Sequence, residues 1–389
     1  MTRFVGFYAC ITKTVVASFA GAALAVGSPA GAAVGAVGAP PRAEGPNSQI
    51  QTAPGTSAAP DVSALSWTVT DVGTGNLLAA KAPHLHLPPA STLKTLFAVA
   101  LLPQLPATAV HTAVTADLDA VEPGSSLVGV REGTSYTVGD LWRGVFLSSG
   151  NDAVHTLARL NGGLQRTLAQ MQATAKRLGA RDTQVRSPDG FDTPGQYSSA
   201  YDLSLIARAG LRNSDFRRYC GTKWAQFPAA GGPDSFGIQN TNRLLVGSHG
   251  VEPYPGMIGV KNGYTSEAGN TLVAAATHND RTILVTIMNP QEGSSNAVYD
   301  ESRELLDWGF TEAPHAVTAG IVNGAASHGA PRDPHPARHA ATALHASTAS
   351  GHASSDLTRH LGTAAALLAL AALPFAVRTA RRRRRGSAG

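Results

Sequence analysis

Hydrophobic and polar residues alternate in short segments near both ends of the central part of the chain. Residues 66–70 alternate and lead into a Gly-containing turn at 71–75, after which residues 76–80 return, so this stretch predicts a β-hairpin. Three later segments have the same β-branched, hydrophobic composition with tight turns between them. The three strands expected there are 257–264, 270–277 and 282–288.

Between these strands the hydrophobic positions recur at helical spacing. The expected helices are 91–102, 137–160, 164–178, 201–211 and a closing helix at 297–308. The first of them is almost entirely apolar, which predicts a buried helix. Strands at both ends with helices between them predict an α+β fold, in which helices pack on an antiparallel sheet and an all-helical subregion lies beside it.

The N-terminal part of the chain has the composition of an export segment. Residues 1–33 pass from basic through apolar to small side chains, as a secretory signal peptide does. Residues 34–60 are rich in Gly, Ala, Pro and Ser and are predicted to be a disordered linker. The ordered domain is then expected at 61–312.

The C-terminal part has the composition of a stalk followed by an anchor. Residues 313–360 are rich in Ala, His, Pro and Ser, and the irregular spacing of the histidines favours a solvated stalk over a metal site. Residues 361–377 are uncharged and just long enough for a transmembrane helix. The basic tail 378–389 marks the cytoplasmic side. We therefore expect a single-pass cell-membrane protein whose domain is extracellular.

The charged residues and the cysteines narrow the possible functions. Eight of the 31 Lys and Arg residues lie in the signal segment and the basic tail, so the remaining 23 face 26 acidic residues. The high net charge is therefore no sign of a basic face, and nucleic-acid binding is not expected. Only Cys220 follows the signal segment, which excludes an internal disulfide framework and a cysteine-based metal cluster.

Ser91 and Lys94 are candidates for nucleophilic chemistry. They lie three residues apart in the apolar helix, so their side chains share one face. A serine hydroxyl becomes a useful nucleophile when a base takes its proton. A lysine can be that base when it is neutral, and burial favours the neutral form.

Two further motifs carry polar groups, each with a structural alternative. Ser149 and Asn151 offer a hydroxyl for proton relay and an amide for hydrogen bonding, but either of them, or Asp152, is also suited to cap the following helix. Lys261 lies on an expected strand shortly before Gly263, where it can present a cation to a carboxylate. The alternative for Lys261 is an exposed lysine at a strand end.

Taken in order, these three motifs resemble those of the serine penicillin-binding proteins and β-lactamases. Longer segments resemble the low-molecular-mass D-alanyl-D-alanine carboxypeptidases, and the resemblance covers about residues 60–312. The segments are 88–95, 149–153, 187–195, 197–202, 240–243 and 259–269. The resemblance implies the β-lactamase/penicillin-binding-protein fold, which is transpeptidase-like.

The resemblance also implies a role for each matched residue. Ser91 would be the acylated nucleophile and Lys94 its base, with the main-chain N–H groups of Ser91 and Tyr264 as the oxyanion hole. The other catalytic residues would be Ser149 and Asn151. The substrate-binding residues would be Lys261, Asn262, Gly263 and Tyr264, of which Lys261 would bind the substrate's terminal carboxylate and help keep Lys94 neutral.

The implied reaction removes the last D-Ala from peptidoglycan stem peptides through an acyl-enzyme, which water then hydrolyses. β-Lactam antibiotics mimic the D-Ala-D-Ala end and would trap Ser91. The resemblance implies no metal and no organic cofactor. The partners that the resemblance implies are stem peptides and β-lactams. The membrane, reached through the C-terminal helix, is the third expected partner.

Three positions depart from the family's pattern. Asn262 stands where threonine is more common, and its amide can still donate to a carboxylate, so we expect function with altered affinity. Asp189 stands where a histidine often occurs, and we expect this change to touch only the rim of the site. The arginine that some relatives carry before the final helix is replaced by Val298 and its neighbours, while Arg281 and Arg303 lie elsewhere.

Two other functions stay open. A β-lactamase of the Ser-Asp-Asn class needs a glutamate for deacylation, whereas the triplet here is Ser-Gly-Asn and residues 179–196 contain no glutamate. The second is an inactive wall- or penicillin-binding module, which the change at Asn262 keeps open. A pure binding module, however, has no need of a buried lysine at position 94.

Overall fold

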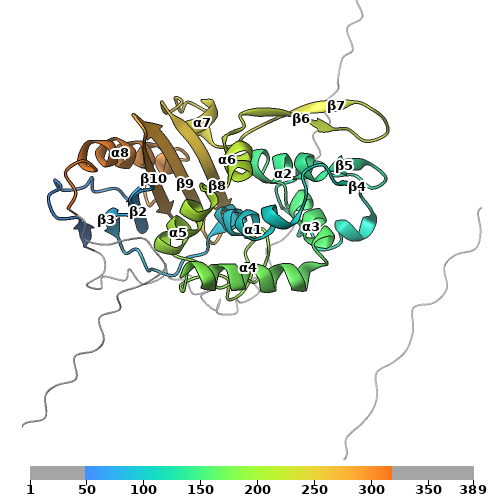
Figure 1. Ribbon diagram of the computed structural model, residues 1–389, viewed down its shortest axis with the longest axis horizontal. Helices are drawn as coiled ribbons and strands as arrows, with labels where there is room; N and C mark the ends of the chain where they lie inside the picture. Colours follow the sequence, from blue (N-terminus) through green and yellow to red (C-terminus); the bar gives the residue numbers. More distant parts are fainter. Residues whose placement is uncertain (1–48, 318–389) are drawn as a thin grey trace, which may run out of the picture. The chain divides into compact units, whose positions relative to one another are not determined.

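A six-stranded antiparallel sheet organises the computed structural model, which describes residues 49–317 (Figure 1). The strand order is β1-β3-β2-β10-β9-β8. The strands are β1 (Ile50–Thr52), β2 (Ser66–Asp71), β3 (Leu77–Lys81), β8 (Met257–Thr265), β9 (Gly269–His278) and β10 (Arg281–Met288). The predicted hairpin is β2–β3, and the three predicted C-terminal strands are β8, β9 and β10. The expected α+β class is thereby confirmed.

Helices cover both faces of this sheet (Figure 1). α8 packs against β2, β9 and β10 on one face, and α5 packs against the same strands on the other. The helices are α1 (Lys94–Leu101), α2 (Val138–Leu147), α3 (Asn151–Leu160), α4 (Leu164–Leu178), α5 (Ala200–Gly210), α6 (Ser214–Gly221), α7 (Arg243–Val246) and α8 (Ala297–Glu312). The first four form the predicted helical subregion beside the sheet.

The sheet separates two hydrophobic cores, and β10 shows why. Side chains alternate between the two faces of a strand. Ile283 and Val285 lie in the core under α8, while Leu284 and Met288 lie in the core shared with the helical subregion. A strand that is hydrophobic on both faces must be central, and β10 pairs with β2 on one side and β9 on the other.

The prediction of one continuous helix at 137–160 is wrong, because this segment forms two helices. α2 ends at Leu147 and α3 begins at Asn151, and Ser149 between them has a φ of +57°. Gly144 lies so close to Val128 that a Cβ there would be 2.8 Å from Val128 Cγ1. A Cβ at Gly150, in the turn itself, would be 2.9 Å from the main-chain nitrogen of Val128. The loop that contains Val128 therefore packs closely against both α2 and the turn, and helical periodicity does not predict such a contact.

Several short elements are absent from the sequence prediction. They are β1, α6, α7, the 3₁₀ turns η2 (Leu102–Gln104) and η3 (Thr115–Asp117), and the ribbons β4 (Val110–Thr112) with β5 (Ser135–Thr137) and β6 (Trp224–Pro228) with β7 (Ser235–Gln239). The 3₁₀ turn η1 (Ala90–Leu93) forms the start of the predicted helix 91–102. The structure differs from the expected linker at 34–60, since Ile50 to Thr52 pair with β3 and Ser57 donates hydrogen bonds to Glu312. These contacts are with distant residues, so local composition does not reveal them.

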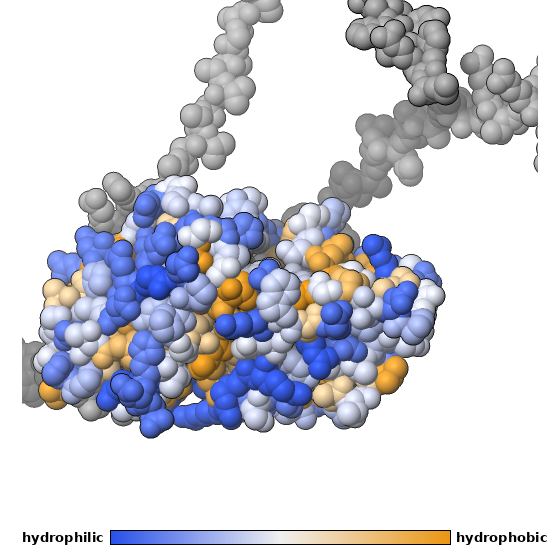
Figure 2. All heavy atoms as spheres, turned by 90° about the horizontal axis from the view of Figure 1, so that it is seen from above, coloured by the Kyte–Doolittle hydropathy of each residue, from blue (hydrophilic) through white to orange (hydrophobic). Residues whose placement is uncertain are grey.

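The described surface is mostly hydrophilic on the face seen in Figure 2, with smaller hydrophobic patches between the polar areas. Between residues 49 and 317, none of the helices is both long and apolar enough to span a bilayer. The predicted signal peptide, transmembrane helix and basic tail lie outside the described residues, as do most of the linker and of the stalk.

Gly309 lets α8 lie directly on the sheet. A Cβ at this position would be 2.8 Å from Ile283 Cγ2 and 2.9 Å from Val69 Cγ1. Because the core is close-packed, we expect Gly309→Val to lower the free energy of unfolding by about 1–3 kcal/mol, measured as a lower Tm. Gly237→Val is the control, since a Cβ there meets no atom within 4 Å. An equal loss of Tm in both variants would contradict this account.

Candidate active site

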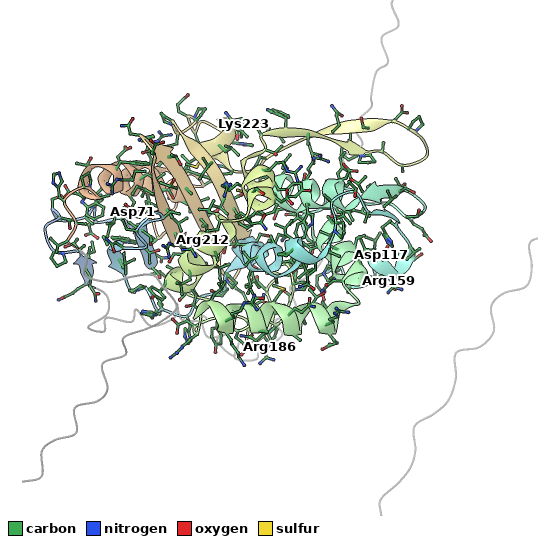
Figure 3. The ribbon with its side chains drawn as sticks, viewed as in Figure 1. Asp71, Asp117, Arg159, Arg186, Arg212 and Lys223 are labelled. Atoms are coloured by element: carbon green, nitrogen blue, oxygen red, sulfur yellow. The ribbon has the colours of Figure 1, made fainter. Side chains whose placement is uncertain are left out.

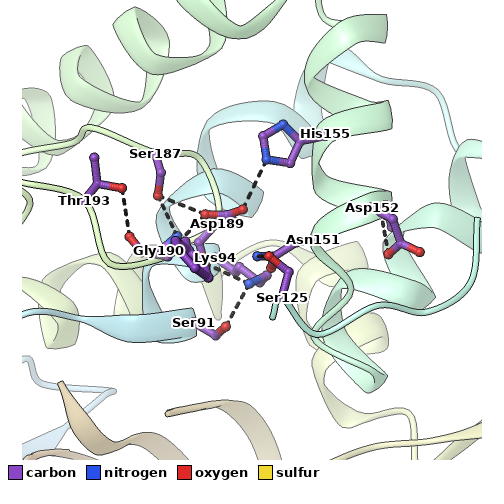
Figure 4. Close-up of polar contacts among 12 residues, drawn as sticks. Ser91, Lys94, Ser125, Asn151, Asp152, His155, Ser187, Asp189, Gly190 and Thr193 are labelled. Atoms are coloured by element: carbon purple, nitrogen blue, oxygen red, sulfur yellow. Dashed lines mark hydrogen bonds and ion pairs between the residues drawn. The ribbon is translucent and has the colours of Figure 1, made fainter. Parts of the chain in front are cut away.

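The structure brings Ser91 and Lys94 together at the junction of η1 and α1. Lys94 Nζ lies 2.8 Å from Ser91 Oγ and 2.8 Å from the main-chain oxygen of Asp189 (Figure 4). The predicted spacing therefore holds, although the first turn is 3₁₀ rather than α. Ala90, directly before the serine, has a φ of +48°, which turns the chain sharply into the helix.

The Lys94 side chain is fully buried. Burial lowers the pKa of its amine from 10.5 to about 8, although the negative charges of Asp189 and Asp152 oppose this shift. A shift of this size corresponds to about 3 kcal/mol in favour of the neutral form. Roughly a tenth of the molecules would then carry a neutral amine at pH 7, which is enough for a general base.

Lys261 also reaches into the interior, from strand β8. Its side chain is 1% exposed and its Nζ donates to the main-chain oxygen of Asn262 at 2.8 Å. Burial, and secondly the nearby charge of Lys94, lower the pKa of Lys261 well below its usual value. The alternative of an exposed lysine at a strand end is wrong. No carboxylate of residues 49–317 forms an ion pair with this amine.

Asn151 is the first residue of α3, and Figure 4 draws it in the same polar group as Lys94 and Ser125. Its Nδ2 donates to Ser125 Oγ at 3.0 Å and its main-chain N–H to Ser126 O at 2.8 Å. Ser149 lies two residues earlier in the turn between α2 and α3 and is 8% exposed. The capping alternative is wrong, because the N-cap of α3 is Gly150 and no side chain caps this helix.

Asp152 holds the loop that carries Ser125. Its carboxylate accepts hydrogen bonds from the main-chain N–H groups of Val128, Gly129 and Val130 at 3.0, 2.7 and 2.8 Å. Three such bonds satisfy a buried carboxylate and fix the loop. Sequence reasoning considered Asp152 only as a cap, since the loop that it binds lies more than twenty residues earlier.

Gly263 allows strand β8 to pass directly beside the nucleophile. A Cβ here would lie 2.7 Å from the main-chain nitrogen of Ser91. Thr271, which pairs with Gly263 on β9, donates from Oγ1 to Pro89 O at 3.1 Å and so ties the sheet to the segment before Ser91. Tyr264 follows with its side chain 69% exposed. The two main-chain N–H groups predicted as an oxyanion hole therefore lie on adjoining segments.

The side chain of Asn262 points away from that of Lys261 and joins a separate cluster of polar side chains. Its Oδ1 accepts from Thr241 Oγ1 at 3.0 Å, and its side chain also hydrogen-bonds Tyr299. The guanidinium of Arg243 lies 5.2 Å from the centre of the Tyr299 ring. Val298 is buried in the core, so the position expected for the missing arginine holds none, but Arg243 supplies a cation from α7. Such a short helix gives no signal in the sequence.

The expectation that Asp189 touches only the rim is wrong. Asp189 is 1% exposed and its main-chain oxygen accepts from Lys94. The adjacent Gly190 has a φ of +86°, and a Cβ there would be 1.8 Å from Ala90 O. The segment therefore packs against the backbone of the nucleophile, where only glycine fits.

The Asp189 carboxylate has three hydrogen-bond donors. Oδ2 lies 3.2 Å from His155 Nε2 on α3, and Oδ1 accepts from Ser187 Oγ and from the main-chain N–H of Phe191, both at 2.9 Å (Figure 4). Sequence reasoning missed His155, although a histidine four residues after the Ser-x-Asn triplet lies on the same helix as Asn151.

The remaining candidates for chemistry are unsuited to it. Cys220 is fully buried, and burial raises the pKa of its thiol to about 12, so a reactive thiolate is disfavoured. In the part of the chain that the structure describes, no group of three or more His, Cys, Asp or Glu side chains is arranged to hold a metal ion.

Comparison with known protein families agrees with this geometry. The family model of peptidase S11, D-alanyl-D-alanine carboxypeptidase, matches residues 53–292. D-alanyl-D-alanine carboxypeptidase DacB2 of Mycobacterium tuberculosis is 38% identical over 260 residues, which cover 66% of this chain and 86% of that protein. D-alanyl-D-alanine carboxypeptidase DacD of Escherichia coli is 32% identical, and the match covers 64% of each.

Solved structures show the same similarity. A crystal structure of a D-alanyl-D-alanine carboxypeptidase from Mycobacterium tuberculosis superposes with a TM-score of 0.63 at 37% identity, covering 70% of this chain and 99% of that one. The Streptomyces K15 DD-transpeptidase superposes with a TM-score of 0.61 at 30% identity, covering 66% and 100%. The predicted fold family is thereby confirmed.

Gly263 offers a direct test of the site's geometry. We expect Gly263→Ala to slow the acylation of Ser91 by a fluorescent penicillin by about 100-fold, because the added methyl group separates β8 from the Ser91 N–H. Gly237→Ala is the control, as its Cβ enters open space. Acylation rates and circular dichroism are measured on all three proteins. An acylation rate in folded Gly263→Ala equal to that of the parent would refute the proposed approach of the two segments.

Proposed function

The chain belongs to the D-alanyl-D-alanine carboxypeptidase family of serine peptidases, and from this membership we propose that it removes the terminal D-Ala of peptidoglycan stem peptides through an acyl-enzyme on Ser91. One observation carries the proposal. Lys94 Nζ lies 2.8 Å from Ser91 Oγ, and burial lowers the pKa of that amine to about 8. A serine and a partly neutral lysine at hydrogen-bond distance form a nucleophile with its base.

Acylation begins when the neutral Lys94 amine takes the proton of Ser91. The Ser91 oxygen then attacks the carbonyl carbon of the penultimate D-Ala, and the carbonyl oxygen becomes an oxyanion. The main-chain N–H groups of Ser91 and Tyr264 would stabilise this charge, and the glycine between Asn262 and Tyr264 lets them converge. Donors of this kind are effective because they are already oriented before the charge develops.

The tetrahedral intermediate collapses when the carbon–nitrogen bond of the peptide breaks. The departing D-Ala nitrogen needs a proton, which the protonated Lys94 returns through the Ser149 hydroxyl. Asn151, held by Ser125, would hydrogen-bond the substrate during this step. A water molecule then attacks the ester carbonyl and gives one proton to Lys94. When the bond between Ser91 Oγ and the carbonyl carbon breaks, Lys94 passes this proton to Ser91 Oγ, and the shortened peptide leaves as a carboxylic acid.

Lys261 would recognise the terminal carboxylate of the substrate. Burial and the nearby charge of Lys94 lower the pKa of Lys261, and no carboxylate among the described residues pairs with its amine to offset them. An arriving carboxylate supplies such a partner and favours protonated Lys261. The positive charge beside the base then favours neutral Lys94 at the moment when it must accept a proton. Asn262 and Arg243 would add hydrogen bonding and charge on the outer side.

The two alternatives from the sequence are less well supported. An inactive binding module would not need Ser91 and Lys94 in contact, nor a second buried lysine beside them. A β-lactamase needs a carboxylate available to activate the deacylating water. The Asp189 carboxylate accepts hydrogen bonds from three protein groups and is therefore engaged. We propose that β-lactams acylate Ser91 and inhibit the enzyme.

Transpeptidation is a second candidate reaction, favoured by the similarity to the Streptomyces K15 DD-transpeptidase. The first half-reaction is the same, and the acyl group then passes to an amine instead of water. The same residues would therefore serve both reactions until the acyl-enzyme has formed. Adding an amine acceptor such as glycine to the assay distinguishes them, because a transpeptidase forms a new peptide while D-Ala is released.

We further propose that the enzyme is exported and works at the outer face of the cell membrane. The basic, apolar and small-residue order of 1–33 supports export, and the uncharged stretch 361–377 with its following arginines supports a C-terminal anchor. The stalk between domain and anchor would let the active site reach the cell wall.

The activity is tested on the full-length protein with a diacylated Lys-D-Ala-D-Ala peptide. We expect the parent to release D-Ala and Ser91→Ala to release none, because the nucleophile is lost. Ser235→Ala is the matched control, as this serine lies on the exposed ribbon β7 and should leave activity unchanged. Absence of D-Ala release from folded parent protein would sink the proposed reaction.

The anchor is tested by deleting residues 361–389. We expect the shortened protein to be recovered from the culture medium or the soluble extracellular fraction, while the full-length protein stays with the membrane. Cell fractionation followed by labelling with fluorescent penicillin measures both. Membrane retention of the shortened protein would show that another segment anchors it.

A further inference from the structure

His155 and Asp189 form a buried pair that the acyl-transfer scheme leaves without a role. His155 Nε2 lies 3.2 Å from Asp189 Oδ2, and the two side chains are 8% and 2% exposed. Position 189 is also one of the positions at which the chain departs from the family pattern. A buried polar pair so close to the proposed base calls for a physical reason, because burying it costs solvation free energy.

The Asp189 side chain fixes the local main chain. Ser187 Oγ and the Phe191 N–H donate to Oδ1, and Ser187 Oγ also accepts from the Gly190 N–H at 3.1 Å. These bonds close a tight turn around Asp189, and His155 holds the remaining carboxylate oxygen. The Asp189 carbonyl at the centre of the turn is therefore held in one position, where it accepts from Lys94 Nζ at 2.8 Å.

The orientation of the Lys94 amine matters as much as its charge. A neutral amine has two N–H groups and one lone pair, and it accepts the proton of Ser91 only if the lone pair faces Oγ. A hydrogen bond from one N–H to the Asp189 carbonyl turns the lone pair in that direction. Catalytic groups lose rate steeply when displaced by about 1 Å, so fixing this carbonyl has a kinetic consequence.

We propose that His155 and Asp189 are positioning residues for the base: His155 holds the Asp189 carboxylate, and the Asp189 carbonyl holds the Lys94 amine with its lone pair toward Ser91. The inference rests on the proposed function, since it assigns these two residues to the acylation of Ser91. Figure 4 shows the chain of contacts from His155 through Asp189 to Lys94 and Ser91.

The pair also affects the charge state of Lys94. The charged groups around that amine are Asp189, Asp152 and Lys261. Burial opposes ionisation of Asp189, but the hydrogen bond from His155 and the charge of Lys94 lower its pKa to about 2, so it stays a carboxylate. This negative charge raises the pKa of Lys94. Removing the charge from Asp189 should therefore let Lys94 become neutral at lower pH.

The experiment measures the rate constant for acylation of full-length protein by a fluorescent penicillin from pH 5 to 10. Three variants separate position from charge, and they are His155→Leu, His155→Gln and Asp189→Asn. The rate constant should rise with pH as Lys94 loses its proton (the acid limb) and then level off at a plateau. We expect His155→Leu to reduce the plateau rate about tenfold and to leave the acid limb near the pH of the parent's. His155→Gln keeps an N–H donor and should recover most of the plateau. Asp189→Asn should move the acid limb to lower pH by roughly half to one unit.

His111→Leu is the matched control. His111 Nε2 lies 2.7 Å from Oδ2 of the buried Asp117, and Arg159 Nε lies 3.3 Å from Asp117 Oδ1, so this is a second His–Asp pair, nearer the surface. Figure 3 shows Asp117 and Arg159 side by side in the helical subregion, and neither hydrogen-bonds Lys94. Losing this pair should lower Tm and leave the pH profile of acylation unchanged.

The outcomes are distinct. A plateau rate and acid limb in folded His155→Leu equal to those of the parent would overturn the inference, as would a loss equal to that in His111→Leu. An unchanged acid limb in Asp189→Asn would overturn the part of the inference in which the charge of Asp189 raises the pKa of Lys94. Failure of the parent itself to be acylated would instead overturn the proposed function, and the inference with it. Thermal unfolding of each variant corrects the rates for the folded fraction.

Discussion

The active site depends on burying the amine of Lys94. A lysine in water is charged and cannot accept a proton, so the structure must remove water from it at a cost of about 3 kcal/mol, as judged from its lowered pKa. That cost is met by the packing of the helical subregion around α1, where Lys94 is fully buried. The rest of the site keeps this amine oriented once it is buried.

Three segments that are distant in the sequence meet at this amine. The turn into α1 brings Ser91, strand β8 brings Lys261, and the segment around Asp189 brings the carbonyl that orients the base. Two glycines make the approach possible. Gly263 admits β8 to the Ser91 N–H, and Gly190 admits its segment to the Ala90 carbonyl. Larger side chains at either position would separate the segments by the width of a methyl group or more.

The electrostatics of the site are unbalanced until a substrate arrives. Two buried lysines lie close enough for the charge of one to lower the pKa of the other, while Asp189 and Asp152 partly compensate. The terminal carboxylate of a D-Ala-D-Ala peptide carries the missing negative charge. In the proposed reaction, recognition and activation are thus linked, since the carboxylate that identifies the substrate would also stabilise protonated Lys261. This linkage suits an enzyme that must act only on chains ending in a free carboxylate.

The sequence by itself determined the fold class, the central strands and the order of the three motifs, because hydrophobic periodicity reports burial and because i to i+3 spacing already pairs Ser91 with Lys94. The roles of Asp189, His155 and Arg243 and the break at Ser149 needed the tertiary structure. Each depends on a contact between segments remote in the chain: α3 with the Asp189 turn, α7 with α8, and the Val128 loop with α2. Local patterns predict which residues are buried, whereas only the folded chain decides which buried groups meet.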